Sequence, residues 1–267
     1  MNEPEPFDVF AIRYAHLGGR HPGENFIFAD PHESASDLDY FIWVVRRGDV
    51  CFVVDTGFAQ PAADRRRREF LRCPAQALRL LDINPDKVSD VIITHLHYDH
   101  AGNLDKFPTA RFHLQDREMA YATGRCMCHP TLRYAFDLDD TLHMVRCVYD
   151  GRAEFHDGDT EIMPGLTLHR VGGHTAGLQI VRVWTRRGWL VLASDAAHLY
   201  GNVNDERPFP AVYNVADMLE GFRTLHRLAQ SPQHIIPGHD PLVMARYPAA
   251  TPSLAGIAVR LDVAPRD

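Results

Sequence analysis

The stretch VIITHLHYDHAG, residues 91–102, places three histidines and an aspartate within six positions, directly after an apolar run. His95 and His97 lie two residues apart, so in extended backbone their side chains point the same way. Asp99 and His100 follow where the chain turns. Burying four titratable groups without a metal would leave charge unpaired. Nitrogen and carboxylate donors on a short turn suit a divalent ion such as zinc. The stretch therefore predicts two ligands for each of two adjacent ions.

Three further donors stand at the ends of apolar runs. VGGHTAG contains His174, VLASDAAH contains Asp195 and IIPGHD contains His239. Side chains at strand ends can converge on one edge of a sheet, and a carboxylate such as Asp195 can bridge two metals. Isolated histidines on apolar runs are usually core or surface residues, which is the interpretation we give to His113, His169, His226 and His234.

Composition indicates a globular protein with a net negative charge. The chain has 267 residues and a net charge of -7, and no linker or repeat divides it, so we expect one domain over residues 1–267. A nucleic-acid partner is not expected at this charge. The basic run DRRRREF, residues 64–70, is interpreted as a solvated face rather than a polyanion site. Neither a signal peptide nor a membrane span is expected. Five cysteines, an odd number, favour reduced thiols and a cytoplasmic location.

Short apolar runs predict a β-rich chain with three clear helices. Strands are expected at 9–14, 40–47, 50–57, 88–95, 110–115, 166–171, 178–185, 188–195 and 234–239, and helices at 74–83, 116–123 and 215–230. Residues 121–160 fit no simple pattern, and we interpret them as an insertion that shapes the substrate pocket.

Four motifs in order, THLHYDHAGN, GGHTAG, SDAAH and PGHD, resemble the metallo-β-lactamase superfamily. The resemblance implies an α/β fold, a four-layer αβ/βα sandwich of two mixed β-sheets flanked by helices. It also implies a dinuclear site. The implied first metal is held by His95, His97 and His174, the second by Asp99, His100 and His239, with Asp195 bridging. Asp55 in VVDTG matches the family's aspartate that orients a ligand histidine.

Within the superfamily, the chain looks most like the N-acyl homoserine lactonases. Redox di-iron members carry Glu where this chain has His97, and the main zinc β-lactamases carry Cys near Asp195. Glyoxalase II enzymes usually add a C-terminal domain, whereas about 28 residues follow His239 here. One departure concerns the substrate: lactonases commonly have Tyr three residues after the bridging Asp, where this chain has His198, with Tyr200 two residues further on.

The resemblance implies hydrolysis of a lactone by a hydroxide held between two divalent metal ions, with zinc expected. Asp99 is the expected proton relay, and His198 or Tyr200 the expected donor to the oxyanion. The substrate is an acyl homoserine lactone or a small catabolic ring lactone. The alternatives are a thioesterase or another ester or phosphodiester hydrolase, and a non-catalytic binding protein is disfavoured by the full ligand set. A homodimer is the base-rate expectation.

Overall fold

The apolar runs of the sequence form two β-sheets, in a computed structural model that describes residues 3–266. The first sheet has the order β13-β1-β2-β3-β5-β6-β7, with β4 paired to β1. Its strands are β1 (Asp8–Leu17), β2 (Leu38–Arg47), β3 (Val50–Val54), β4 (Glu69–Phe70), β5 (Asp90–Ile92), β6 (Arg111–Gln115), β7 (Ala153–His156) and β13 (Ala258–Arg260). Strands β1, β2 and β3 pair antiparallel, and β3, β5, β6 and β7 pair parallel.

The second sheet is smaller and has the order β12-β11-β10-β9-β8. Its strands are β8 (Thr160–Met163), β9 (Leu166–Arg170), β10 (Gln179–Thr185), β11 (Gly188–Ser194) and β12 (Ile235–Pro237). The β11–β12 pair is parallel and the others are antiparallel, so both sheets are mixed.

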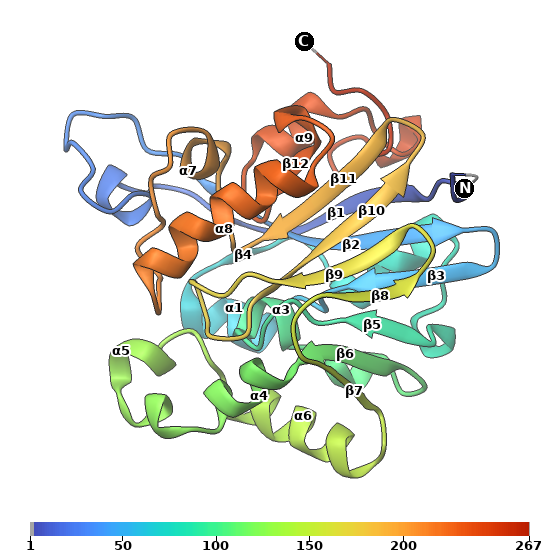
Figure 1. Cartoon of the computed structure of the whole chain (residues 1–267), viewed down its shortest axis with the longest axis horizontal. Coiled ribbons are helices and arrows are strands. Elements are labelled where there is room, and N and C mark those ends of the chain that lie inside the picture. The colour runs from blue at the N-terminus through green and yellow to red at the C-terminus, as the bar shows by residue number, and fades with distance from the viewer. Residues whose placement is uncertain (1–2, 267) are drawn as a thin grey trace.

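Helices cover the outer face of each sheet (Figure 1). They are α1 (Gln60–Arg66), α2 (Pro74–Ala77), α3 (Tyr98–Ala101), α4 (Asp116–Ala122), α5 (Pro130–Arg133), α6 (Leu138–Tyr149), α7 (Tyr200–Asn204), α8 (Val215–Leu228) and α9 (Leu242–Arg246). Single 3-10 turns occupy Pro22–Glu24, Leu78–Leu81, Pro85–Lys87, Leu104–Lys106, Arg125–Cys128, Pro232–His234 and Pro252–Leu254. None of the helices in residues 3–266 has both the length and the apolar character that a membrane crossing requires.

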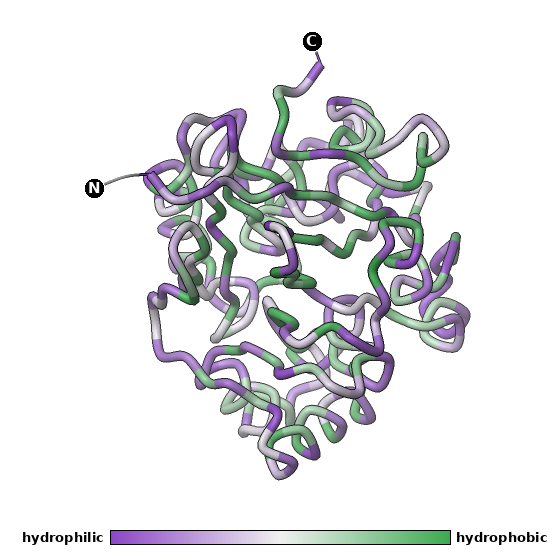
Figure 2. Tube along the Cα trace, turned by 90° about the vertical axis from the view of Figure 1, so that its right-hand side faces the viewer, coloured by the Kyte–Doolittle hydropathy of each residue, from purple (hydrophilic) through white to green (hydrophobic). Residues whose placement is uncertain are grey.

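Three buried clusters separate the four layers. One lies between the sheets, where Phe41 and Trp43 of β2 share a cluster with Leu168 of β9. A second joins the outer face of the first sheet to α1, α2, α3, α4 and α6. The third packs Phe222 of α8 against Ile180 of the second sheet. Because successive side chains of a strand point to opposite faces, each sheet can present apolar side chains both to the other sheet and to its helices. Apolar residues run through the interior of the trace (Figure 2). The expected αβ/βα sandwich is confirmed.

Local structure departs from the sequence-based expectations at three places. The strand expected at 88–95 ends at Ile92, so the histidine cluster lies in a loop. The helix expected at 74–83 is an α-helical turn, α2, followed by a 3-10 turn. Residues 121–160 contain α5, α6 and β7, and α6 and β7 belong to the sandwich, because β7 pairs with β6. Of this stretch, Tyr121 and residues within 130–135 line the pocket described below.

Candidate metal centre and active site

A buried aspartate that follows the neighbouring strand β3 fixes the loop after β5. Asp55 follows β3 with a φ of 61°, a left-handed conformation that a non-glycine residue adopts at a cost. Its Oδ1 accepts the backbone N–H of Thr94 at 2.8 Å, and its Oδ2 accepts the Thr94 hydroxyl at 2.8 Å. These bonds fix Thr94, two residues after the end of β5, and so position the loop that carries His95 and His97.

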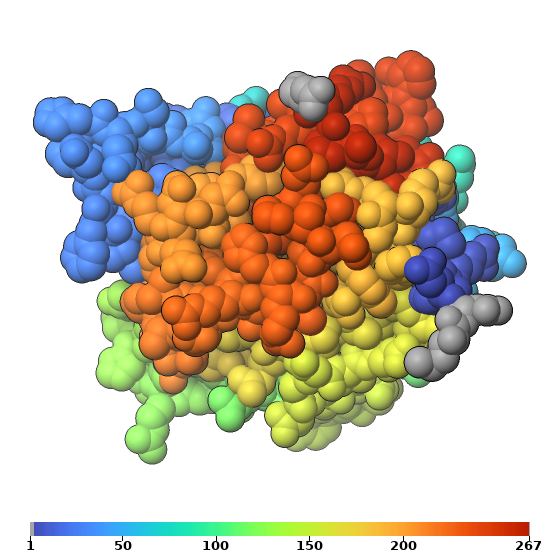
Figure 3. Space-filling view, turned by 45° about the horizontal axis from the view of Figure 1, so that its top comes forward, coloured from blue at the N-terminus to red at the C-terminus, as the bar shows by residue number. Residues whose placement is uncertain are grey.

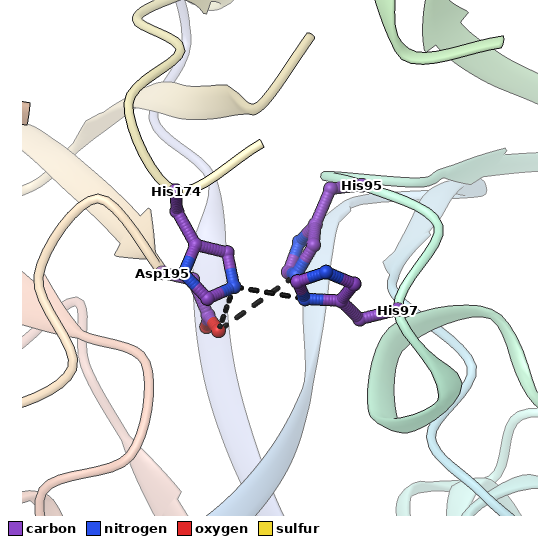
Figure 4. Close-up of side chains that lie close together, drawn as sticks. All are labelled: His95, His97, His174 and Asp195. Carbon is purple, nitrogen blue, oxygen red and sulfur yellow. Dashed lines mark hydrogen bonds and ion pairs between the residues drawn. The ribbon is translucent and has the colours of Figure 1, made fainter. Parts of the chain in front are cut away.

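Four donors, His95, His97, His174 and Asp195, form the first group (Figure 4). His97 Nδ1 lies 3.0 Å from His95 Nε2 and 2.9 Å from His174 Nε2. Asp195 Oδ2 lies 3.1 Å from His174 Nε2 and 3.7 Å from His95 Nε2. Ligand atoms around a tetrahedral zinc ion lie about 3.3 Å apart at the usual bond lengths. The group has the size of one zinc site.

The second group is Asp99, His100 and His239. Asp99 Oδ2 lies 3.8 Å from His100 Nε2 and 3.9 Å from His239 Nε2. The other oxygen of Asp195, Oδ1, lies 3.2 Å from His100 Nε2 and 3.0 Å from His239 Nε2. The two oxygens of Asp195 thus face different groups, which is the geometry of a bridging carboxylate.

The ring tautomers show that these groups fit metal ions. His174 Nδ1 donates to the carbonyl of Ala211 at 2.6 Å, and His239 Nδ1 donates to the carbonyl of Asp39 at 3.0 Å. His100 Nδ1 donates to Asp55 Oδ2 at 2.7 Å. With the proton on Nδ1, each neutral ring points its Nε2 lone pair at the carboxylate of Asp195, so a second proton or a metal cation must lie between them. Buried His100 Nε2 has no hydrogen-bond partner in residues 3–266.

Electrostatics keep His95, His97 and Asp195 in their metal-binding forms. Burial, and then the neighbouring imidazoles, hold the pKa of His95 well below its usual value, and the same holds for the pKa of His97. Burial raises the pKa of the Asp195 carboxyl, but the surrounding histidines outweigh burial and leave that pKa well below its usual value. Neutral imidazole and ionised carboxylate are the forms that bind divalent ions. For His100 and His239, burial lowers the pKa, but the nearby carboxylates, chiefly Asp195, together outweigh burial and raise the pKa of both rings.

Glu118 on α4 connects the two loops that carry the first group, and sequence analysis missed it. Its Oε1 accepts the N–H of Leu96 at 2.9 Å. Its Oε2 accepts the hydroxyl of Thr175 at 2.6 Å and the N–H of Gly177 at 3.0 Å. The side chain is fully buried. Glutamate in a short helix is usually exposed, so only the packing of α4 against both loops identifies it.

A pocket of about 810 Å³ opens over both donor groups. Its walls come from the segment of residues 17–24, from α5 and the residues after it, and from residues 209–213. The chain that includes and follows this first wall projects from the body of the molecule beside residues near 205 (Figure 3). The Ile27 N–H, just beyond the wall, donates to the Pro208 carbonyl at 2.9 Å. His97, Asp99, His174, Asp195 and His239 line the pocket floor.

The structure separates the two candidates for a substrate donor. His198 lines the pocket, lies face to face with Phe209 and places Nε2 3.0 Å from Asp195 Oδ2. Burial lowers the pKa of His198 to about 3, although Asp195 opposes this shift. Tyr200 does not line the pocket, and its ring packs in the core between the sheets, under the guanidinium of Arg246. Contrary to the sequence-based expectation, Tyr200 is not placed to contact a substrate.

The histidines interpreted as ordinary core or surface residues lie outside both groups. Among residues 3–266, none of the donor clusters includes His113, His169, His226 or His234. His113 instead pairs with Asp90 at 3.1 Å, and His169 pairs with Asp159 at 2.9 Å. The seven predicted donors come together, and the isolated histidines do not join them.

Comparison with known proteins agrees with this geometry. The sequence profile of the metallo-β-lactamase superfamily matches residues 36–239, which is most of the chain and includes all seven donors. The chain belongs to the metallo-β-lactamase superfamily. Within it, the N-acyl homoserine lactonase AttM of Azorhizobium caulinodans is 30% identical over 191 residues, 65% of this chain and 66% of the relative. The N-acyl homoserine lactonase AiiA of Bacillus thuringiensis subsp. kurstaki is 28% identical over 166 residues, 61% of this chain and 60% of the relative.

Solved structures of the superfamily share the fold over nearly the whole chain. An N-acyl homoserine lactone hydrolase with the product N-hexanoyl-L-homoserine bound at its catalytic metal centre superposes with a TM-score of 0.74. That match covers 91% of this chain and 96% of the other at 21% identity. The sequence matches to the curated lactonases span less than two thirds of their length.

Proposed function

We propose that this superfamily member is a dinuclear-metal-dependent hydrolase that opens a lactone, a cyclic ester. The observation that carries the proposal is the division of the Asp195 carboxylate, with Oδ2 toward the first donor group and Oδ1 toward the second. When bound, a pair of divalent ions supplies hydroxide at neutral pH and polarises a carbonyl group. His95, His97 and His174 would hold one ion, and Asp99, His100 and His239 the other.

The protein's own side chains account for the remaining requirements of ester hydrolysis. Asp99 lines the pocket and forms no ion pair with Lys or Arg in residues 3–266, so its carboxylate can take up the proton given off by the attacking hydroxyl group and pass it to the departing alkoxide. Tyr14 donates its hydroxyl to the backbone carbonyl of Asp99 at 2.9 Å and fixes this residue in place. His198 Nε2 lies 3.0 Å from Asp195 Oδ2, the oxygen that faces the first group. Asp55 fixes the ring of His100.

Zinc is the metal that we propose, because the first group has tetrahedral spacing and mainly imidazole donors. A cytoplasmic location is supported by the five cysteines, all of which are free thiols. The single-domain organisation, the homodimer and the absence of a nucleic-acid partner stay predictions.

Metal removal and reconstitution test the function. The purified protein is analysed for bound metals, stripped with a chelator and assayed against lactones of different ring size and acyl length. We expect about two ions per chain and loss of lactone opening on stripping, with recovery on adding Zn²⁺. Thioesters and phosphodiesters in the same panel distinguish the alternative hydrolases. Lactone opening that survives complete removal of the metals would falsify the mechanism.

A further inference from the structure

The basic run of residues 64–70 does more than cover a solvated face. Arg65 and Arg66 form ion pairs with Asp137 at 2.6 Å and 2.7 Å. Arg67 is exposed and ends α1 in the left-handed conformation. Arg68 turns the other way and lines the pocket over the metal-binding groups. The four arginines therefore have different roles, and the role of Arg68 is open.

Arg68 presents to the pocket a guanidinium that forms no direct ion pair within residues 3–266. Its Nε donates to the hydroxyl of Tyr98 at 3.1 Å, and its Nη1 donates to the carbonyl of Arg66 at 2.6 Å. These two bonds fix the guanidinium without neutralising it. Within residues 3–266, no carboxylate forms an ion pair with Arg68 and no acceptor bonds its Nη2. A half-buried guanidinium held by neutral groups, with one donor edge free, is suited to bind an anion.

Arg20 lines the same pocket. Its Nε donates to Asn25 at 3.1 Å, and its guanidinium lies 5.5 Å from the centre of the Phe209 ring. It also forms no ion pair with a carboxylate in the described part of the chain. Burial raises the pKa of Tyr40 to about 12, and the positive charges of Arg68 and Arg20 oppose that rise. Arg20, Arg68 and Tyr40 all line the pocket.

The residues next to Arg68 and Arg20 lie beside the second donor group. Tyr98, which binds Arg68, directly precedes Asp99, and the ring of Tyr40 lies edge-on to His239 at 5.1 Å. The one other charged residue of the lining that is not a metal donor is Glu24, which is exposed and accepts the backbone N–H of His21. The wall beside the second donor group is thus positive, while Leu17, Leu38 and Leu132 make the rest of the pocket apolar.

We propose that the substrate carries an anionic group, a carboxylate or a phosphate, which Arg68 binds with Arg20 beside it while the lactone ring lies over the metal-binding groups. The inference rests on the proposed function and narrows its substrate class. A neutral acyl chain leaves both guanidiniums partly desolvated without an anionic partner, which is unfavourable. An acidic lactone pairs them, and Arg68 is then a residue that determines specificity.

Binding of inert analogues tests the proposal separately from catalysis. The probes are 5-oxoproline, a five-membered lactam acid, and its uncharged amide, measured by calorimetry on the metal-loaded protein. We expect the acid to bind about ten-fold or more tightly than the amide. Arg68→Gln should abolish this preference and Arg68→Lys should keep part of it. Arg67→Gln, the same substitution at an exposed neighbour, should leave the preference unchanged.

Hydrolysis of the matching lactones completes the test. Five-membered lactones bearing a carboxylate, a phosphonate or a carboxamide are compared by kcat/KM. The ratio between the carboxylate and the phosphonate substrates shows which anion Arg68 and Arg20 favour. Equal binding of acid and amide by the native protein overturns the proposal. So does a preference that persists in Arg68→Gln, since the carboxylate would then bind elsewhere, including at the metals. If the native protein binds 5-oxoproline more tightly than its amide but hydrolyses none of the lactones, the anion site is upheld and the lactonase function is rejected.

Discussion

Asp55 accepts the Nδ1–H of His100 at 2.7 Å with the same oxygen that accepts the hydroxyl of Thr94 at 2.8 Å. One buried carboxylate therefore sets both the path of the loop after β5 and the tautomer of a metal donor. The Thr94 hydroxyl also lies 2.8 Å from the hydroxyl of Ser194, at the end of β11 in the other sheet. The donors contributed by the two sheets are thus joined through this short network.

Replacing this carboxylate should weaken one metal more than the other. In Asp55→Asn the amide accepts the His100 proton less strongly, so the Nε2 lone pair becomes less basic and less well oriented. We expect affinity at the second site to fall about 10- to 100-fold, as measured by competition with a coloured chelator. Asp90→Asn is the control, because Asp90 also pairs with a histidine, His113, but outside the donor groups. Unchanged affinity at both sites would contradict this role for Asp55.

Glu118→Ala should destabilise the whole centre. The substitution leaves three donors without an acceptor, the N–H groups of Leu96 and Gly177 and the hydroxyl of Thr175. We expect the free energy of unfolding to fall by about 3 kcal/mol or more, measured by guanidinium denaturation of the metal-free protein. Glu220→Ala removes an exposed ion pair with Arg223 and should cost about 0.5 kcal/mol or less. Equal effects of the two variants would refute the linking role.

Asp137→Asn should loosen the wall formed by α5 and the residues after it. Asp137 joins this wall to Arg65 and Arg66, and Arg66 Nη1 also donates to the carbonyl of Tyr134 at 3.0 Å. We expect KM for a hydrolysed lactone to rise about two- to five-fold with little change in kcat. Added NaCl should raise KM in the native enzyme and have a smaller effect in the variant, because salt screens the ion pairs. Identical salt profiles would count against this contact.

Asp140 should make stability depend on pH. Burial, and then the charge of Asp137, raise the pKa of Asp140 to about 7 from the ordinary 3.8. The folded protein therefore binds more protons than the unfolded chain between these values, so its stability falls as pH rises from about 4 to about 7 and stays reduced above 7. Asp140→Asn should raise stability at pH 8 by on the order of 2 kcal/mol, a Tm gain of about 5 °C, and much less at pH 5.

Asp139→Asn is the matched control for this pH effect, because Asp139 is the adjacent residue and is exposed. Melting curves of both variants and the native protein at pH 5 and pH 8 suffice. A gain at pH 5 as large as that at pH 8, or an equal gain in Asp139→Asn, would show that the pKa of Asp140 is not the cause.

Much of the metal centre could be predicted from the sequence because its donors are local or stand at recognisable strand ends. The cluster from His95 to His100 lies within six positions, and Asp195 directly follows an apolar strand. Burial of such groups without a cation is costly in any fold, so the pattern indicates a metal before the topology is known. Tyr200 shows the limit: it lies two residues beyond His198, yet α7 begins at Tyr200 and turns it into the core.

The sequence by itself determined the donor types and the strands and helices, because periodicity and short spacings are properties of the local chain, and the resemblance of its motifs to a known superfamily implied the layered fold. Only the tertiary structure decided which oxygen of Asp195 faces which histidine, that Glu118 joins two donor loops, and that Arg68 lines the pocket. His239 and the carbonyl of Asp39 that fixes its ring are 200 residues apart in the chain. Such contacts depend on how the two sheets pack, and local spacing carries no information about that packing.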